Sequence, residues 1–282
     1  MKLPIHTDLS GKVAVVTGAG GVLCSMFSRA LAASGAKVAL LDINTESVQK
    51  VAAEICAEGY EAKGYACDVL NQESLEAVHK AVLSDFGPCD ILLNGAGGNN
   101  ARANTDLEQF HPGDLDKDVK TFFDLPQEGV EWVFRLNFIG TLLPTQVFGR
   151  DMTEKSGCNI VNISSMNAYT PLTKIPAYSG AKAAISNFTQ WLAVHFAPAG
   201  IRVNALAPGF FVTNQNRDLL FAPDGTPSAR AGKILAATPM GRFGEAEELI
   251  GTLLFLVNND AAGFITGVVI PIDGGFSAYS GV

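Results

Sequence analysis

Short apolar runs rich in β-branched residues alternate with longer stretches of helical periodicity along most of the chain. This alternation is typical of βαβ units, in which a helix connects two parallel strands. Seven runs are predicted to be strands: KVAVVT, KVALLD, EAKGYACDV, DILLNGA, NIVNISS, IRVNALA and GVVIPID. Helices are predicted over residues 22–34, 46–57, 74–86, 128–151, 176–197 and 245–257. Because the strands read as continuous apolar runs, helices should cover both faces of one parallel sheet.

The chain has 282 residues, of which 48% are apolar and 17% charged, and this suits one large core. We therefore predict a single α/β domain over residues 1–282, a Rossmann-like doubly wound parallel sheet of about seven strands with helices on both faces. Such sheets bind ligands at the carboxyl ends of their strands. Two segments, 98–127 and 209–240, interrupt the alternation after strand ends. We expect them to be excursions on the substrate side, the alternative being plain surface loops.

Composition argues against several classes of function. The net charge of −8, without a cluster of Lys or Arg, argues against a nucleic-acid partner. No stretch reaches the roughly eighteen uncharged apolar residues that a membrane span needs, so no membrane partner is expected. The cysteines are odd in number and form no CxxC pair, which favours reduced thiols in a cytoplasm and no metal site. They are Cys24, Cys56, Cys67, Cys89 and Cys158.

The first strong glycine cluster, TGAGGVLC at residues 17–24, directly follows the first predicted strand. A loop at this position can hold a phosphate, because glycines let the backbone approach it and the following helix offers free N–H groups. Its spacing is unusual, since Val22 and Cys24 stand where the second and third glycines are expected. We expect Gly21 to provide the close approach one position early. Cys24 should be small enough to pack there, and Cys24→Gly should bind a dinucleotide at least as well.

Asp42 is the first polar residue after the second predicted strand. A carboxylate at this point can accept both hydroxyls of an adenosine ribose and would repel a 2′-phosphate. No Lys or Arg lies in the glycine loop or beside Asp42 to hold such a phosphate, so the sequence favours NAD over NADP. The alternative is an aspartate that begins a turn before Asn44.

Tyr178 and Lys182 stand four residues apart, shortly after Pro176, and so share one face of a predicted helix. An ammonium one turn away should lower the tyrosine pKa toward the range in which it can act as an acid or base. A YxxxK pair is weak evidence alone. Ser165, at the end of the strand NIVNISS, lies at the same predicted edge and could hold a substrate oxygen, although a serine there is more often a turn or helix cap.

From about Gly11 to its C-terminus the sequence resembles the short-chain dehydrogenase/reductase family. The TGxxxGxG loop of the family falls on residues 17–24, its CDV segment on 67–69, its NNAG segment on 94–97 and its PG motif on 208–209. The resemblance implies hydride transfer with NAD as the cofactor. The resemblance, together with the position of the glycine loop, predicts sixteen cofactor-binding residues. They are Gly18, Gly20, Gly21, Val22, Leu23, Asp42, Asp68, Val69, Asn94, Ala96, Gly97, Tyr178, Lys182, Pro208, Gly209 and Thr213.

The same resemblance assigns four catalytic residues. Tyr178 would protonate a carbonyl oxygen, or deprotonate an alcohol in the reverse direction, and Ser165 would orient that oxygen. Lys182 would lower the pKa of Tyr178 and hold the nicotinamide ribose. Asn137, in LNFIGT, would anchor a water relay to bulk solvent.

Amides and a few cations follow the predicted strands near this site. Amides suit several hydroxyl groups and a fixed cation suits a carboxylate, so the residues favour a sugar acid over a steroid or acyl chain. The alternative for each asparagine is a turn former at the surface. The candidate substrate residues are Asn99, Arg102, Ser165, Asn167, Lys174, Asn214 and Arg217, with Arg102, Lys174 or Arg217 meeting the carboxylate.

Several segments, among them GAGGNN, FFDLP and APGFFVTNQNRDLLF, are similar to the D-mannonate oxidoreductases of the short-chain type, also called fructuronate reductases. The resemblance implies interconversion of D-fructuronate and D-mannonate, and a homotetramer as is common in the wider family. Two alternatives remain: another polyol or sugar-acid dehydrogenase, such as a gluconate 5-dehydrogenase type, and a cofactor-binding scaffold without turnover.

Overall fold

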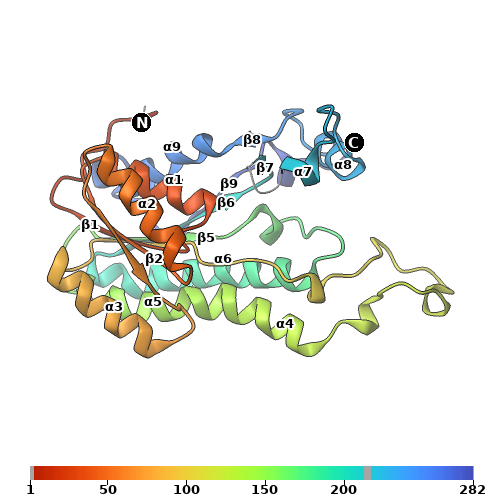
Figure 1. Cartoon of the computed structure of the whole chain (residues 1–282), viewed down its shortest axis with the longest axis horizontal. Helices are drawn as coiled ribbons and strands as arrows, with labels where there is room; N and C mark the ends of the chain where they lie inside the picture. Colours follow the sequence, from red (N-terminus) through yellow and green to blue (C-terminus); the bar gives the residue numbers. More distant parts are fainter. Residues whose placement is uncertain (1–2, 213–216, 282) are drawn as a thin grey trace.

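Seven parallel strands form one sheet in the computed structural model, which describes residues 3–212 and 217–281 (Figure 1). The strand order is β3-β2-β1-β4-β5-β6-β9. The strands are β1 Val13–Thr17, β2 Lys37–Asp42, β3 Ala62–Ala66, β4 Ile91–Asn94, β5 Asn159–Ile163, β6 Arg202–Pro208 and β9 Val269–Ile272. Six of the seven lie within a run predicted to be a strand, and β6 extends one residue beyond its run, so the predicted fold class is confirmed.

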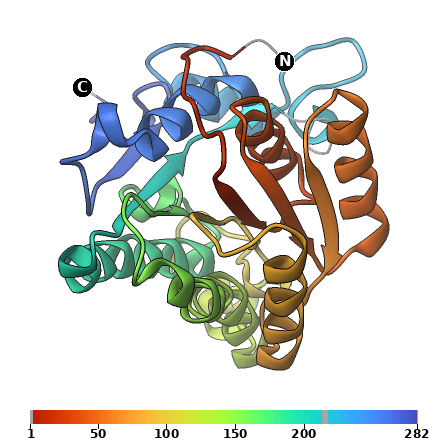
Figure 2. The ribbon, with the colours of Figure 1, turned by 90° about the vertical axis from the view of Figure 1, so that its left-hand side faces the viewer.

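Helices cover both faces of this sheet (Figure 2). On one face α1, α2 and α9 pack against the sheet around one hydrophobic cluster, and on the other face α3, α5 and α6 enclose a second cluster. The helices are α1 Val22–Ala33, α2 Thr45–Ala57, α3 Gln72–Asp85, α4 Gln127–Phe134, α5 Gly140–Phe148, α6 Pro176–Phe196, α7 Arg217–Leu220, α8 Ala229–Ala236, α9 Ile250–Val257 and α10 Asn259–Ala262. Within the described ranges, none of them is long and apolar enough to cross a membrane.

The starts of the helices follow from local sequence. The side chains of Asn44 and Asn71 precede α2 and α3 and accept hydrogen bonds from the backbone N–H groups of Ser47 and Ser74, both at 3.0 Å. These bonds satisfy N–H groups that a first helical turn leaves unpaired. Pro176 occupies the first turn of α6, where its missing N–H costs nothing.

The prediction of one helix near residues 128–151 is wrong in its continuity. α4 and α5 are separated by a π-helical turn over Arg135–Ile139, and a 3₁₀ turn, Gly149–Met152, follows α5. Insertion of such a turn changes the direction of the side chains within it, and π turns are frequent at functional sites. Asn137 lies within this turn and is fully buried.

The two predicted excursions lie at the same end of the molecule (Figure 1). The first contains three 3₁₀ turns, Ala101–Ala103, Asp114–Asp116 and Phe122–Asp124. The second carries α7 and α8, and its strand β7, Phe211–Val212, pairs with β8, Gly244–Glu245. An ion pair of 2.7 Å between Glu108 and Lys233 joins the two excursions.

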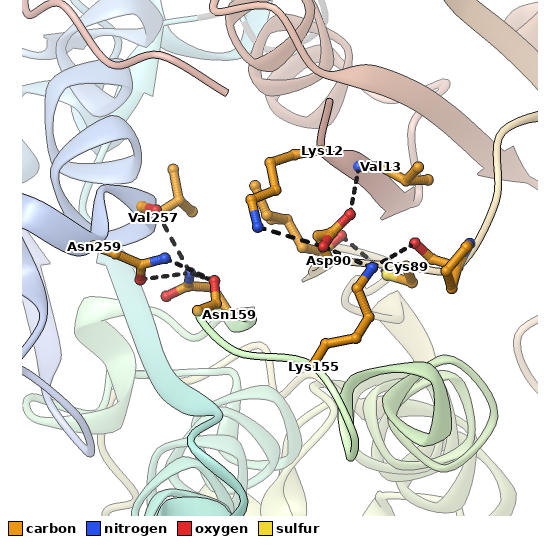
Figure 3. A network of polar contacts seen from close by, with 11 residues as sticks. Lys12, Val13, Cys89, Asp90, Lys155, Asn159, Val257 and Asn259 are labelled. Atoms are coloured by element: carbon orange, nitrogen blue, oxygen red, sulfur yellow. Dashed lines mark hydrogen bonds and ion pairs between the residues drawn. The ribbon is translucent and has the colours of Figure 1, made fainter. Parts of the chain in front are cut away.

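A polar network at the opposite, amino edge of the sheet holds three strands together (Figure 3). Asp90 is only 4% exposed, and its carboxylate accepts a hydrogen bond of 2.9 Å from the N–H of Val13 at the start of β1. Lys12 and Lys155 lie 3.5 and 2.7 Å from the same carboxylate. The backbone carbonyl of Asp90 accepts from the N–H of Asn159, which begins β5. One residue therefore joins β1, β4 and β5.

We predict that Asp90→Ala lowers the free energy of unfolding by about 2 kcal/mol, because it leaves the buried N–H of Val13 without its acceptor and removes both lysine contacts. Urea unfolding followed by circular dichroism measures the change. Asp118→Ala, at an exposed position in the first excursion, is the control and should change stability by less than about 0.5 kcal/mol. Equal effects of the two variants would contradict the role given to Asp90.

Candidate active site

A cavity of about 340 Å³ opens at the carboxyl ends of the central strands. It lies where the strand order reverses, between β1 and β4, which is the point at which doubly wound sheets bind ligands. The residues that line it are Gly18, Gly21, Val22, Leu23, Cys24, Asp42, Ile43, Cys67, Asp68, Val69, Gly95, Ala96, Gly97 and Leu136. Nine of the predicted cofactor residues are among them.

Close backbone approach explains two glycines of the loop after β1. Gly18 has φ +67°, and a Cβ atom there would lie 2.9 Å from the backbone of Ala96. A Cβ on Gly20 would lie 2.8 Å from the hydroxyl of Ser47 and 3.0 Å from the carboxylate of Asp42. Gly21 is the N-cap of α1, so the first turn of that helix begins at the cavity. Its backbone N–H groups can therefore face an anion, as the sequence predicts.

Asp42 lies at the end of β2 and is fixed by the glycine loop. One carboxylate oxygen accepts a hydrogen bond of 2.9 Å from the N–H of Gly20, and the other accepts one of 2.9 Å from the N–H of Asn44. Each carboxylate oxygen has a further lone pair. Asp42 therefore has a fixed orientation and can still accept hydrogen bonds from a ligand in the cavity.

Three predicted cofactor residues, Asn94, Pro208 and Gly209, have contacts inside the protein and are not among the residues that line the cavity. The amide nitrogen of Asn94 donates to Thr145 and to Asn162, both at 2.9 Å. Pro208 ends β6, and a Cβ on Gly209 would lie 2.6 Å from Asp273, so these two residues pack against the segment after β9. Thr213 lies outside the described residues, as does Asn214.

Ser165, Tyr178, Lys182 and Asn137 come together beside Gly97. A Cβ on Gly97 would lie 2.7 Å from the side-chain oxygen of Asn137 and 3.3 Å from Nζ of Lys182. The side chain of Ser165 lies near enough to the hydroxyl of Tyr178 to lower the pKa of that phenol. Nζ of Lys182 lies 5.6 Å from the centroid of the Tyr178 ring. The strand end, α6 and the π-helical turn therefore bring the four side chains to one place.

The π-helical turn fixes Asn137 through both of its amide atoms. Its nitrogen donates to the carbonyls of Gly98, at 2.7 Å, and of Val133, at 2.8 Å. Its oxygen accepts from the N–H of Gly98 at 3.3 Å. The same residue thus joins the loop after β4 to the helix α4.

Burial controls the protonation of the tyrosine and the lysine. It raises the pKa of Tyr178, and the side chain of Ser165 offsets part of this rise. It lowers the pKa of Lys182 to about 8. The expectation of a lowered tyrosine pKa is therefore wrong for the protein by itself. The physical reason for the raised pKa of Tyr178 is that burial removes water from the phenolate, while Lys182 donates its hydrogen bond, at 2.8 Å, to the carbonyl of Ile163.

The candidate substrate residues have different surroundings. The amide of Asn99 donates to Asn104 at 3.0 Å within the first excursion. Asn167 is 7% exposed, and its side-chain oxygen has no hydrogen-bond partner among the described residues. Lys174 has φ +71°, and the guanidinium of Arg217 lies 5.8 Å from the centroid of the Phe221 ring.

Cys24 and Gly95 form a contact that the sequence analysis did not predict. A Cβ on Gly95 would lie 2.1 Å from the sulfur of Cys24, so the sulfur occupies the space above this glycine. Cys24 is 6% exposed, and burial raises the pKa of its thiol to about 12. The sequence signal that could have indicated this contact is a pair of departures from the family pattern. Cys24 replaces the third glycine of the loop, and Gly95 replaces the second asparagine of NNAG. Loss of the sulfur in Cys24→Gly would leave a void at this contact.

The protein belongs to the short chain dehydrogenase family, whose model matches residues 12–221. It is therefore an oxidoreductase that acts on alcohol groups or the corresponding carbonyls.

Two curated relatives and one crystal structure are similar over nearly the whole chain. An "Uncharacterized oxidoreductase" of Haemophilus influenzae is 60% identical, with 100% of this chain and 99% of the relative covered. An "Uncharacterized oxidoreductase UxuB" of Bacillus subtilis is 51% identical, with 99% of this chain and 100% of the relative covered. The crystal structure is that of a "putative D-Mannonate oxidoreductase" from Haemophilus influenzae with bound NAD. It is 60% identical with a TM-score of 0.94, and 98% of each chain is covered.

We predict that Gly95→Ala lowers the free energy of unfolding by about 1–3 kcal/mol, because the new methyl group overlaps the sulfur of Cys24. The double variant Cys24→Ala with Gly95→Ala should be more stable than Gly95→Ala alone, since the overlapping atom is gone. Urea unfolding of the two single variants and the double variant measures this coupling. Gly232→Ala is the control, because a Cβ there meets nothing within 4 Å. Strictly additive changes would show that the contact has no energetic effect.

Proposed function

We propose that this protein interconverts a keto sugar acid and its hydroxy acid with NAD(H), D-fructuronate and D-mannonate being the pair favoured. The observation that carries the proposal is the meeting of Ser165, Tyr178 and Lys182 beside Gly97, which also lines the cavity at the strand reversal. The named crystal structure with bound NAD supports both the cofactor and the substrate pair.

The cavity residues fit NAD. The glycines at 18 and 20 leave no room for a Cβ, and a pyrophosphate would meet the first turn of α1. Asp42 would accept the hydroxyls of the adenosine ribose and repel a 2′-phosphate. Asp68 and Val69 would border the adenine, while Tyr178 and Lys182 would hold the nicotinamide ribose. NAD(H), when bound there, supplies or accepts the hydride at the substrate carbon.

Tyr178 would move the proton of the reaction. Since burial raises its pKa, the phenol is protonated at neutral pH and can give its proton to a carbonyl oxygen that becomes an alcohol. Ser165 would hold the same oxygen through its hydroxyl. Lys182, whose pKa is about 8, is mostly charged at neutral pH and would stabilise the phenolate that remains. Asn137 would connect this group to solvent through a water relay.

Cytoplasmic location and tetramer formation belong to the same proposal. All five cysteines are free thiols, as a reducing compartment would keep them. Large apolar side chains are exposed on α6, where Trp191 is 57% and Val194 78% exposed. An exposed apolar face of this kind supports contact with another subunit.

We predict that the purified protein oxidises NADH with fructuronate and prefers NADH over NADPH, because Asp42 disfavours a 2′-phosphate. Initial rates with fructuronate, 5-ketogluconate and simple ketoses, each with both cofactors, are the measurement. A higher kcat/KM for 5-ketogluconate would favour the gluconate 5-dehydrogenase type. NADH binding without turnover of any of these compounds would favour the scaffold and contradict the proposed enzyme.

We predict that Tyr178→Phe lowers kcat about a hundredfold or more and leaves NADH binding and the fold intact, since only the proton donor is lost. Stopped-flow rates and NADH fluorescence titration measure the two effects. Tyr169→Phe is a matched control, because its hydroxyl donates to the carbonyl of Val269, at 2.7 Å, and takes no part in the proposed chemistry. Turnover of Tyr178→Phe within a few-fold of the parent enzyme would contradict the assignment of Tyr178 as the proton donor.

A further inference from the structure

The structure distinguishes the three cations that could meet a substrate carboxylate. Arg102 lies against α4, and its guanidinium is 4.0 Å from the carboxylate of Glu128. A Cβ atom on Gly129 would lie 3.3 Å from the backbone of Arg102. Arg217 lies in α7 over the ring of Phe221. Both side chains thus already have a contact within the protein, whereas Lys174 belongs to the segment between Ser165 and Tyr178.

Lys174 has an unusual backbone conformation. Its φ of +71° is the only positive value for a non-glycine residue in the described part of the chain. The left-handed region costs free energy for a residue with a side chain, whereas glycine and, to a lesser degree, asparagine adopt it readily. Strain of this kind persists only where the surrounding structure maintains it, and it is concentrated at ligand-binding sites.

The first excursion maintains this conformation. The carbonyl of Lys174 accepts a hydrogen bond of 2.9 Å from the N–H of Thr105. Two residues later Pro176 begins α6, and the carbonyl of Ile175 accepts from the N–H of Ser179. Lys174 is therefore fixed two residues before α6, the helix that carries Tyr178, and because it is exposed an entering ligand can reach it.

Two further charges lie near Lys174, one from each excursion. Nζ of Lys233 on α8 lies 2.7 Å from the carboxylate of Glu108. The positive charge of Lys174 also helps to lower the pKa of Glu108, after the larger effect of Lys233. Glu108 is therefore paired with Lys233, while Lys174 has no ion pair within 4 Å among the described residues, so its positive charge can meet an anionic substrate.

A buried acceptor lies on the same segment. Asn167 follows Ser165 by two residues, and its N–H donates to the Ser165 hydroxyl at 3.3 Å. Its side-chain oxygen is buried and has no partner among the described residues. A buried amide oxygen without a donor is unfavourable, and a hydroxyl group of a substrate would satisfy it. The segment thus offers an acceptor for a hydroxyl and, further along, a cation for a carboxylate.

We propose that Lys174 is the specificity-determining residue that binds the substrate carboxylate, and that its left-handed conformation is retained for this purpose at the expense of stability. The proposal rests on the proposed function, since it requires an acidic substrate. Glu108 is the counter-ion of Lys233, and Asn167 accepts a hydroxyl of the same substrate.

The test compares Lys174→Gly, Lys174→Asn and Lys174→Arg in the full-length enzyme. Glycine and asparagine relieve the strain and remove the charge, so both variants should unfold at a higher temperature than the parent. Their KM for fructuronate should rise tenfold or more, while kcat/KM for fructose, a ketose without the carboxylate, stays within twofold. Lys174→Arg should keep the fructuronate KM within a few-fold. Lys50→Ala, which removes one exposed charge on α2, is the control. It should change neither the KM for fructuronate nor the kcat/KM for fructose.

The outcomes separate this inference from the function on which it rests. If the parent enzyme turns over no keto sugar acid, the proposed function fails. If the parent reduces fructuronate but Lys174→Gly and Lys174→Asn keep its KM, the carboxylate assignment to Lys174 is overturned. If both variants lose acid selectivity and are also less stable, Lys174 binds the carboxylate but the claim of a retained strain is overturned.

Discussion

The reversal of strand order between β1 and β4 is the constraint on which the rest of the site depends. At this reversal the loops after the two strands diverge to opposite faces, and the cavity opens between them. The hydrogen bond from Gly20 to Asp42 then ties the loop after β1 to the end of β2. Thr17 accepts from the N–H groups of Gly95 and Ala96 and ties the same region to the end of β4. Three strand ends are thereby held in a fixed relation around the proposed cofactor.

The sequence predicted the parts of the fold that depend on local patterns. Continuous apolar runs located all seven strands, and Pro176 marked the start of α6 to the residue. Because residues four apart share a helical face, the relation of Tyr178 to Lys182 followed as well. Patterns of this kind act within one element, and a single sequence contains them in full.

Features that depend on contacts between distant segments could not be predicted in the same way. The π-helical turn around Asn137 interrupts a continuous helical pattern, and its amide bonds to Gly98 far along the chain. The pKa of Tyr178 depends mainly on burial and then on the side chain of Ser165, so spacing alone gave the wrong direction. Both cases require knowledge of what packs against the residue.

Cys24 and Gly95 show how two departures from a family pattern can compensate each other. A thiol in place of the third glycine would crowd a larger residue at position 95, but glycine leaves space for the sulfur. The helix α1 can therefore keep a close approach to β4 with a side chain at its first turn. Both residues line the cavity. Cysteine at position 24 and glycine at position 95, in place of the family's residues, therefore also change the cavity wall that the cofactor would meet. The unusual residues of the glycine loop thus change the packing locally, and the N–H groups of the first turn of α1 can still face an anion.

The groups proposed for proton transfer and those proposed for substrate specificity lie on parts of the molecule that differ in rigidity. The proposed proton-transfer groups lie just after β5, on α6 and in the π-helical turn, whose backbones are fixed by the sheet and by helical hydrogen bonds. The proposed specificity groups Lys174 and Asn167 lie on the segment between β5 and α6, beside excursions that meet through the exposed pair Glu108 and Lys233, and such pairs contribute little stability. Substrate choice can therefore change through the excursions while the chemistry stays constant. Lys174 is the link between the two parts, since its carbonyl is bonded to the first excursion and its backbone continues directly into the helix that carries Tyr178.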